Sequence, residues 1–310
     1  MRHITGALQN LAALFRQVAR EELLHRHGRL RADQIHQHSD GSFFTEADLI
    51  SEKRLIEGAV SLFPDAIVTG EEEISEDPYP FFARAQDKTV VIFDPIDGTG
   101  AFKRGEDRYG MLGAVIKNGQ TVGGVIYTPG HGVADESGIL QPEKDIMVIA
   151  EKGRGCWMYE KGDKKNAVRL SLSGRPLSLK DHAKIAFACR NQDAVYHDIL
   201  AQDVAGYMPC GNASHDYTMI LTGACDAAFY SEGFVNDSIG RSPPWDHAAG
   251  ILAIQEAGGY AGLPYHGRDG VPYTPLACHD RLLVASTKTL FQSVYSHIAA
   301  RAPALTKPRL

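Results

Sequence analysis

The stretch Val90-Val91-Ile92-Phe93-Asp94-Pro95-Ile96-Asp97-Gly98-Thr99 joins an apolar run to two carboxylates and a glycine turn. The apolar run predicts a buried strand that ends at Asp94, and we expect Pro95 to turn the chain out of the sheet. Asp97 follows three residues after Asp94, in a tight turn that Gly98 permits. Two carboxylates about 4 Å apart repel by about 4 kcal/mol at an effective dielectric constant of about 20, so a site that holds both favours cations. Hard divalent ions with oxygen ligands, above all Mg²⁺, suit such a pair.

The alternative for this stretch is a plain surface turn, because Asp, Gly and Pro are common turn formers. Two further acids favour a site instead. Glu71 follows an expected strand over 66–69, and Asp246 begins an apolar helix. Taken singly, Glu71 also fits a solvated run of charges, and Asp246 also fits a helix N-cap.

Phosphate is the ligand that the turn itself suggests. A helix directly after it would place the backbone N–H groups of Gly98 and Thr99 at the positive helix end, where phosphate groups bind readily. The formal net charge of −6 would otherwise repel a phosphate ester, which again points to bound cations. The same charge leaves no basic field for a nucleic-acid backbone, so a nucleic-acid partner is not expected.

Composition is that of an ordinary globular protein. The chain has 310 residues, of which 44% are hydrophobic and 23% charged, consistent with one large domain or two packed halves. The five cysteines are scattered without a Cys-x-x-Cys pair, so neither a zinc knuckle nor a disulfide framework is indicated. No stretch approaches the roughly twenty apolar residues that span a bilayer. We expect a cytoplasmic protein without a membrane partner.

Periodicity divides the chain into two halves. An α+β half over 1–175 would carry the first acidic motifs, and an α/β half over 176–310 would carry Trp245-Asp246. Strands are expected over 66–69, 89–93, 111–116, 121–127, 146–150, 156–159, 184–188, 227–230, 259–262 and 282–285, and helices over 4–18, 45–63, 246–257 and 288–299. Asn118-Gly119 predicts a hairpin turn between two of these strands, because both residues tolerate positive φ.

Three segments together resemble the signatures of the inositol monophosphatase family. They are Gly70-Glu71-Glu72, Asp94-Pro95-Ile96-Asp97-Gly98-Thr99 and Trp245-Asp246-x-Ala248-Ala249-Gly250, in the family's order and spacing. The resemblance covers about residues 8–298. It implies a layered α-β-α-β-α sandwich, a homodimer and a magnesium-dependent, lithium-sensitive phosphatase.

The resemblance also implies residue roles. Glu71, Asp94 and the Ile96 carbonyl would bind a first Mg²⁺, which orients and acidifies the attacking water. Asp94, Asp97 and Asp246 would bind a second, which stabilises the leaving oxygen; the family uses two or three ions per site. The catalytic set would be Thr99, Asp48 and Glu71, and the substrate would contact Gly98, Thr99, Asp246, Tyr230 and Ser214.

Asp48 carries two alternatives. In the family pattern it would partner Thr99, whose hydroxyl aids the nucleophilic water. Thr45-x-x-Asp48 is also a capping-box pattern, so Asp48 could serve only the helix start. Glu72 would hold metal-bound water.

Departures from the family pattern concern the alcohol that is recognised. His38 stands where a lysine is common, and Tyr230 stands where a glutamate often contacts the inositol ring, with Glu232 two residues later. We therefore expect a small phosphorylated metabolite, with inositol phosphate, histidinol phosphate, fructose 1,6-bisphosphate and 3'-phosphoadenosine 5'-phosphate as alternatives. His215 and Asp216 fit either a pocket wall or a capping and packing role.

Two rival functions remain for this sequence. An aspartyl-nucleophile phosphatase needs acids two residues apart, whereas Asp94 and Asp97 are three apart. A cation-binding regulatory protein without turnover is the alternative from another class, and turnover of p-nitrophenyl phosphate with Mg²⁺ would separate it from an enzyme.

Overall fold

The computed structural model describes the chain except residues 1–4, 40, 136–139, 190–205, 210–211, 232–233, 236–237, 240–241, 265–268, 280, 302 and 304–310. Its described α-helices are α1 (Gly6–Val18), α2 (Glu46–Leu62), α3 (Glu71–Ile74), α4 (Pro78–Ala85), α5 (Thr99–Arg104), α7 (Ala213–Thr222), α8 (Pro244–Glu256) and α9 (Lys288–Arg301). A π-helical segment, η1 (Ala19–Leu23), continues α1, and 3₁₀ turns lie at η2 (Ala32–Gln34), η3 (Lys164–Asn166) and η4 (Leu179–Asp181). Within the described residues, no helix has the length and apolar character needed to cross a bilayer.

A seven-stranded sheet forms the first β layer. Its order is β11 (Val168–Arg169), β10 (Gly155–Glu160), β9 (Ile146–Glu151), β6 (Gln120–Thr128), β5 (Gly110–Lys117), β4 (Thr89–Asp97) and β3 (Ile67–Gly70). All neighbours are antiparallel except β3 and β4, which are parallel. The hairpin between β5 and β6 turns at Asn118 and Gly119, both at positive φ as predicted.

A mixed five-stranded sheet forms the second β layer. Its order is β13 (Gly206–Pro209), β12 (Lys184–Cys189), β14 (Ala227–Ser231), β18 (Arg281–Ala285) and β17 (Tyr260–Gly262). Short hairpins are formed by β1 (Ile35–Gln37) with β2 (Phe43–Thr45), by β7 (Gly132–Ala134) with β8 (Leu140–Pro142), and by β15 (Phe234–Val235) with β16 (Ser238–Ile239).

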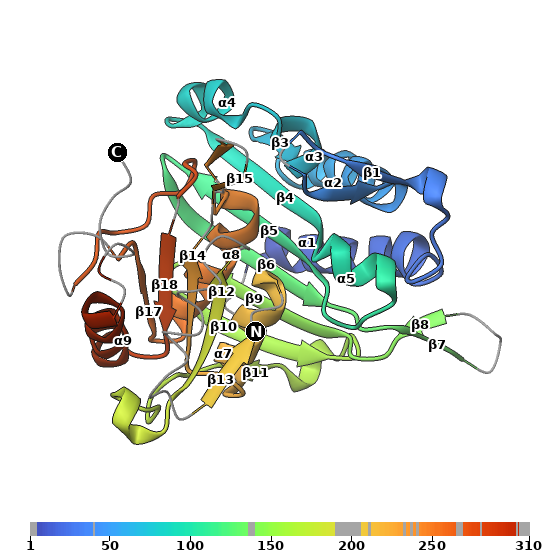
Figure 1. Cartoon of the computed structure of the whole chain (residues 1–310). Helices are drawn as coiled ribbons and strands as arrows, with labels where there is room; N and C mark the ends of the chain where they lie inside the picture. Colours follow the sequence, from blue (N-terminus) through green and yellow to red (C-terminus); the bar gives the residue numbers. More distant parts are fainter. Residues whose placement is uncertain are drawn as a thin grey trace.

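Alternation along the strands explains the layers seen in Figure 1. Val91 and Phe93 of β4 face the core under α1 and α2, whereas Val90 and Ile92 face the layer that holds α7 and α8. The second sheet covers the other side of α7 and α8, and its outer face packs against α9. Because α8 lies between two sheets, it is buried nearly all round. The order is the α-β-α-β-α sandwich that the sequence predicted.

One local expectation is wrong. Pro95 does not turn the chain out of the sheet, because β4 continues through Asp97. Asp94 pairs with Leu112 and Asp97 pairs with Gly110, so β4 has one more residue than β5 between these two pairs. A bulge of this kind accommodates the proline, which has no N–H to donate, and re-aims the two carboxylates.

Candidate active site

Three acidic side chains meet at one edge of the first sheet. Glu71 begins α3 directly after β3, Asp94 lies in β4, and Asp246 lies in the first turn of α8. One carboxylate oxygen of each lies within 4.8 Å of the other two. Because β3 and β4 are parallel neighbours, their C-terminal ends lie side by side and bring Glu71 and Asp94 together. Asp246 is not the N-cap, since Pro243 holds that position.

Burial and mutual repulsion both disfavour the charged forms of these acids. Asp94 is 2% exposed, and its Oδ1 has no hydrogen-bond partner among the described residues. Burial, and then the charges of neighbouring acids, hold the pKa values of Asp94 and Glu71 well above their usual range. A carboxylate oxygen that is buried, unpartnered and surrounded by acids fits a hard cation with oxygen ligands. The cluster is therefore a candidate metal centre.

Asp97 is held beside this group by a helix N-terminus. It accepts a hydrogen bond from the backbone N–H of Ser214, in the first turn of α7. Burial raises the pKa of Asp97 to about 6, and hydrogen bonding from the Ser214 hydroxyl and then from the backbone N–H groups of Ser214 and Ala213 opposes that rise. Asp97 is not one of the three acids within 4.8 Å of one another, although its charge contributes to the raised pKa of Asp94.

Thr99 lies between the β4 turn beside the candidate metal centre and Asp48. Its hydroxyl lies 3.0 Å from the Ile96 carbonyl oxygen and 3.2 Å from Asp48 Oδ1. The other oxygen of Asp48 accepts from the Thr45 N–H at 2.8 Å and from the Thr45 hydroxyl at 2.5 Å. The helix cap and the Thr99 contact thus coexist, one on each carboxylate oxygen. Burial, followed by the charge of Glu72, raises the pKa of Asp48 to about 7.

Gly98 occupies a position that only glycine fits easily. It caps α5, the helix expected after the turn, with φ of +89°. A Cβ at this residue would collide with the side-chain amide of Asn212, which also donates to the Arg108 carbonyl. The Asn212 carbonyl oxygen accepts from the His215 N–H at 3.0 Å and from the Ser214 hydroxyl at 3.1 Å. The α5 turn and the start of α7 are therefore locked together.

The expected substrate wall is about as deeply buried as Asp94. Ser214 is fully buried and Tyr230 is 3% exposed. The Tyr230 ring packs edge-on against His247 of α8, with 4.7 Å between ring centroids, in the layer between the two sheets. Asp216 is fully buried in α7, and burial lowers the pKa of His215. Glu232 lies outside the described residues, so its expected role stays a prediction.

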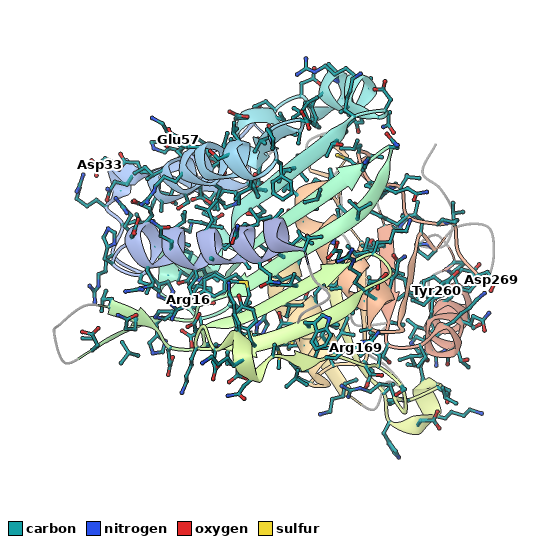
Figure 2. The ribbon with its side chains drawn as sticks, turned by 180° about the vertical axis from the view of Figure 1, so that it is seen from behind. Arg16, Asp33, Glu57, Arg169, Tyr260 and Asp269 are labelled. Atoms are coloured by element: carbon teal, nitrogen blue, oxygen red, sulfur yellow. The ribbon has the colours of Figure 1, made fainter. Side chains whose placement is uncertain are left out.

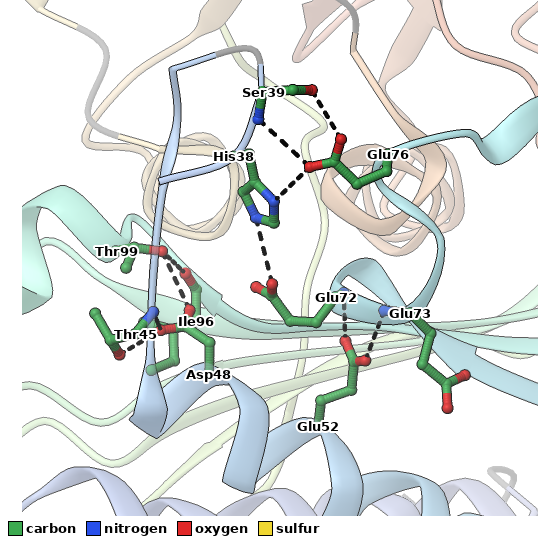
Figure 3. A network of polar contacts seen from close by, with 10 residues as sticks. All are labelled: His38, Ser39, Thr45, Asp48, Glu52, Glu72, Glu73, Glu76, Ile96 and Thr99. Atoms are coloured by element: carbon green, nitrogen blue, oxygen red, sulfur yellow. Dashed lines mark hydrogen bonds and ion pairs between the residues drawn. The ribbon is translucent and has the colours of Figure 1, made fainter. Parts of the chain in front are cut away.

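Glu52 is a site residue that the sequence reasoning missed. Its carboxylate accepts from the N–H groups of Glu72, at 2.8 Å, and Glu73, at 3.0 Å, and so fixes the start of α3 (Figure 3). Burial raises the pKa of Glu52 to about 8. A signal was present, because Glu52 follows Asp48 by one helical turn on the buried face of α2 that also carries Leu55.

His38 links the β1–β2 hairpin to the same edge. Its Nε2 lies 3.3 Å from Glu72 Oε2, and its Nδ1 lies 3.3 Å from Glu76 Oε1 (Figure 3). The Ser39 hydroxyl donates to Glu76 at 2.8 Å. Glu72, which was expected to hold metal-bound water, is thus also the anchor of this hairpin.

A second group of potential ligands, Asp107, His131 and Glu143, lies at the surface. His131 contacts Asp107 through Nδ1 at 2.6 Å and Glu143 through Nε2 at 2.9 Å. The Asp107 carboxylate raises the pKa of His131. Both ring nitrogens of His131 already contact carboxylates, and the group is exposed, so an ion-pair network describes it without a ligand.

Comparisons with known proteins agree with this geometry. The model of the inositol monophosphatase family matches residues 1–301. A putative Nus factor SuhB of Neisseria meningitidis serogroup B is 27% identical over 246 residues, which cover 78% of this chain and 81% of that protein. A fructose-1,6-bisphosphatase/inositol-1-monophosphatase of Aquifex aeolicus is 25% identical, with 84% and 88% covered. The fold matches that of the Thermotoga maritima IMPase with a TM-score of 0.72 at 19% identity, over 97% of this chain and 100% of that one. The chain therefore belongs to the inositol monophosphatase family and is a phosphoric monoester hydrolase.

Proposed function

We propose that this protein is a Mg²⁺-dependent phosphomonoesterase that hydrolyses a small phosphorylated alcohol with an activated water molecule. The observation that carries the proposal is the meeting of Glu71, Asp94 and Asp246 within 4.8 Å, with a buried oxygen of Asp94 left unpartnered. Such an arrangement is costly without a counter-charge and favourable with one. Nearby hydroxyl and backbone N–H groups complete a site for an anionic ester.

The donor set suits two or three Mg²⁺ ions. Glu71, Asp94 and the Ile96 carbonyl would hold one, and Asp94, Asp97 and Asp246 would hold another. When bound, these ions supply acidification of the attacking water and stabilisation of the leaving oxygen. The hydrogen bonds from α7 to Asp97 fix that carboxylate in the orientation it needs.

Thr99 and Asp48 are proposed to move the proton of the attacking water. The Thr99 hydroxyl has one proton and two acceptors, the Ile96 carbonyl and Asp48. When the proton points to Asp48, the Thr99 oxygen can accept a hydrogen bond from the water that attacks phosphorus. The pKa of about 7 leaves Asp48 able to gain and lose a proton at neutral pH.

The substrate is proposed to bind through its phosphate group first. Backbone N–H groups of Gly98 and Thr99 would hold the phosphate, and Asp246 would lie near the leaving oxygen. Ser214 would act by positioning Asp97 and Asn212, because it is fully buried and hydrogen-bonded to both. Tyr230 stands where an acid is common, so we expect the alcohol part of several esters to fit. The candidate substrates are inositol phosphate, histidinol phosphate, fructose 1,6-bisphosphate and 3'-phosphoadenosine 5'-phosphate. We further propose that the protein forms a homodimer, which light scattering can test, and that it is cytoplasmic.

Turnover with defined metals tests the proposal. The purified chain should release phosphate from p-nitrophenyl phosphate with Mg²⁺ and should be inactive in EDTA. A panel of the four natural esters then measures specificity as kcat/KM. If no ester is hydrolysed in Mg²⁺ while Mg²⁺ still binds, the regulatory alternative without turnover replaces this proposal.

A further inference from the structure

A hollow of about 400 Å³ opens on the outer side of α1, and none of its lining residues belongs to the candidate active site. Its walls come from three segments: the exposed face of α1 and η1, the turn between β10 and η3, and one residue of β8. The lining residues are Ala13, Arg16, Gln17, Arg20, Glu21, Leu140, Tyr159, Gly162 and Lys164. Figure 2 shows this side of the molecule, with Arg16 labelled beside α1.

The charges around the hollow do not cancel. Arg20 forms no ion pair with any residue that the structure describes, and the Lys164 ammonium donates only to the neutral Gln9 carbonyl, at 3.3 Å. Glu21 faces the hollow, but its carboxylate is bonded to Arg54 and Gln17. Among the described residues, neither Arg20 nor Lys164 forms an ion pair, although the charge of Arg20 lowers the pKa of the neighbouring Glu21 carboxylate. The four charged side chains that line the hollow are three cations and one anion, on a chain whose net charge is −6.

Arg16 adds a fixed donor to the wall. Its Nε and one Nη bind both oxygens of Asp145, at 2.6–2.9 Å, so the guanidinium is held rigidly. The other Nη makes no hydrogen bond to a described residue. Gly162, at φ of +68°, leaves the space beside it open, because a Cβ there would come within 3.2–3.4 Å of the guanidinium. A rigid guanidinium with a free N–H edge is a strong donor to phosphate or carboxylate oxygens.

The remaining walls are apolar or aromatic. Leu140, Ala13 and the Tyr159 ring complete the hollow, and its volume lies within the range of small-molecule sites, about 300–1,000 Å³. The α1 helix widens into a π-helical turn at Ala19–Leu23, where Arg20 and Glu21 lie. Short π-helical turns are frequent at functional sites.

We infer that this hollow binds a small organic anion, with a phosphate or carboxylate group between Arg16, Arg20 and Lys164 and an apolar body against Tyr159 and Leu140. The inference is independent of the phosphatase proposal. The ligand chemistry is shared by phosphorylated and carboxylated metabolites, and the two kinds of probe below distinguish them.

Isothermal titration of the full chain in EDTA and low salt tests the inference with phenylphosphonate, benzoate and the neutral benzyl alcohol. Without cations the active-site acids repel anions, so saturable binding of an anion reports another site. We expect at least one of the two anions to bind, and the alcohol not to bind. The double variant Arg20→Gln/Lys164→Gln should weaken binding at least about tenfold.

Lys165→Gln is the control for the Lys164→Gln half of the double variant, because each removes one charge from the same turn but Lys165 does not line the hollow. It should change affinity less than about twofold when the titration is repeated at higher salt, which screens the general field. Unchanged melting temperatures would show that all variants are folded. Absence of saturable anion binding, equal binding of benzyl alcohol, or equal losses in Lys165→Gln and the double variant would overturn the inference.

Discussion

Two aspartates of this molecule are equally buried and have opposite surroundings. Asp94 and Asp145 are each 2% exposed, and both lie against the seven-stranded sheet, Asp94 in β4 and Asp145 directly before β9. Asp145 receives a two-point contact from Arg16 and a hydrogen bond from the Tyr127 hydroxyl at 2.8 Å. Asp94 keeps an oxygen without a partner and has Glu71 and Asp246 as neighbours.

The difference teaches that burial alone does not distinguish a structural acid from a functional one. A buried carboxylate must be neutralised, and the chain either supplies the partner or leaves the place for something else. At Asp145 the partner is a side chain, so the site is complete without a ligand. At Asp94 the charged neighbours Glu71, Asp97 and Asp246 add repulsion, so the site fits a cation as the missing partner.

The largest expected effect comes from Asp94→Asn. Loss of a residue that merely orients a metal ligand costs about 10–100-fold, so loss of a ligand proposed to be shared by two ions should lower kcat/KM by at least about a hundredfold. The metal-free protein should become more stable, because one buried like-charge repulsion disappears. Steady-state kinetics and urea unfolding measure the two effects. Asp65→Asn, on the exposed turn after α2, is the control. Activity above a tenth of wild type would reject Asp94 as a ligand.

The second prediction concerns pH and metal. The raised pKa values of Asp48, about 7, and Glu52, about 8, mean that the folded protein binds more protons than the unfolded chain above pH 4.5. The metal-free free energy of unfolding should therefore fall as pH rises from 5 to 8, by on the order of 3 kcal/mol for each of the two groups. Mg²⁺ should restore stability at pH 8, since it would bind the neighbouring acids Glu71, Asp94 and Asp246 and offset the negative charge of the site. Urea unfolding in EDTA and in Mg²⁺ measures this, and a flat or rising metal-free profile would contradict it.

Asp145→Asn tests the other side of the comparison. It leaves Arg16 without its counter-charge, and removal of one partner from a buried pair costs about 3–5 kcal/mol. Because the Arg16 side chain is 29% exposed, we expect about 2 kcal/mol in the free energy of unfolding. The value of kcat with Mg²⁺ should stay within about twofold of wild type. A large loss of kcat in folded protein would show that this ion pair is more than structural.

Much of the candidate metal centre was predictable from sequence, because its residues lie at or near the ends of regular elements. The apolar run before Asp94 and the apolar helix after Asp246 each predict an element whose end carries an acid, and Gly98 predicts the turn between Asp97 and α5. The continuous apolar run of β4 likewise predicts a strand covered on both faces, as the sandwich requires.

What was missed depends on pairing and contact at long range. Pro95 stays in the sheet because β4 forms a bulge opposite β5. The sequence of β4 alone does not indicate this pairing. Glu52 looks like an ordinary charged residue of α2 until its contacts with the first turn of α3 are known. The helix α4 was not predicted, since Pro78 and Pro80 resemble loop residues, yet Pro78 is in a first-turn position where proline is tolerated.

Asp48 lies between Asp145 and Asp94 in this comparison, because it has hydrogen-bond donors and also an acidic neighbour. The variant Thr45→Ala should distinguish its two roles and is expected to have the smallest effect. The variant removes the hydroxyl that caps α2 and binds Asp48 Oδ2, but leaves the Thr99 contact on Oδ1. Loss of the cap should cost about 1 kcal/mol in the free energy of unfolding. The Thr45 hydroxyl lowers the pKa of Asp48, so its removal should shift the acidic limb of the pH–rate profile upward by less than about one unit. Thr45→Ser, which keeps the hydroxyl, should reverse both changes. If the stability falls while the pH profile does not move, Asp48 is a helix cap that takes no part in proton transfer.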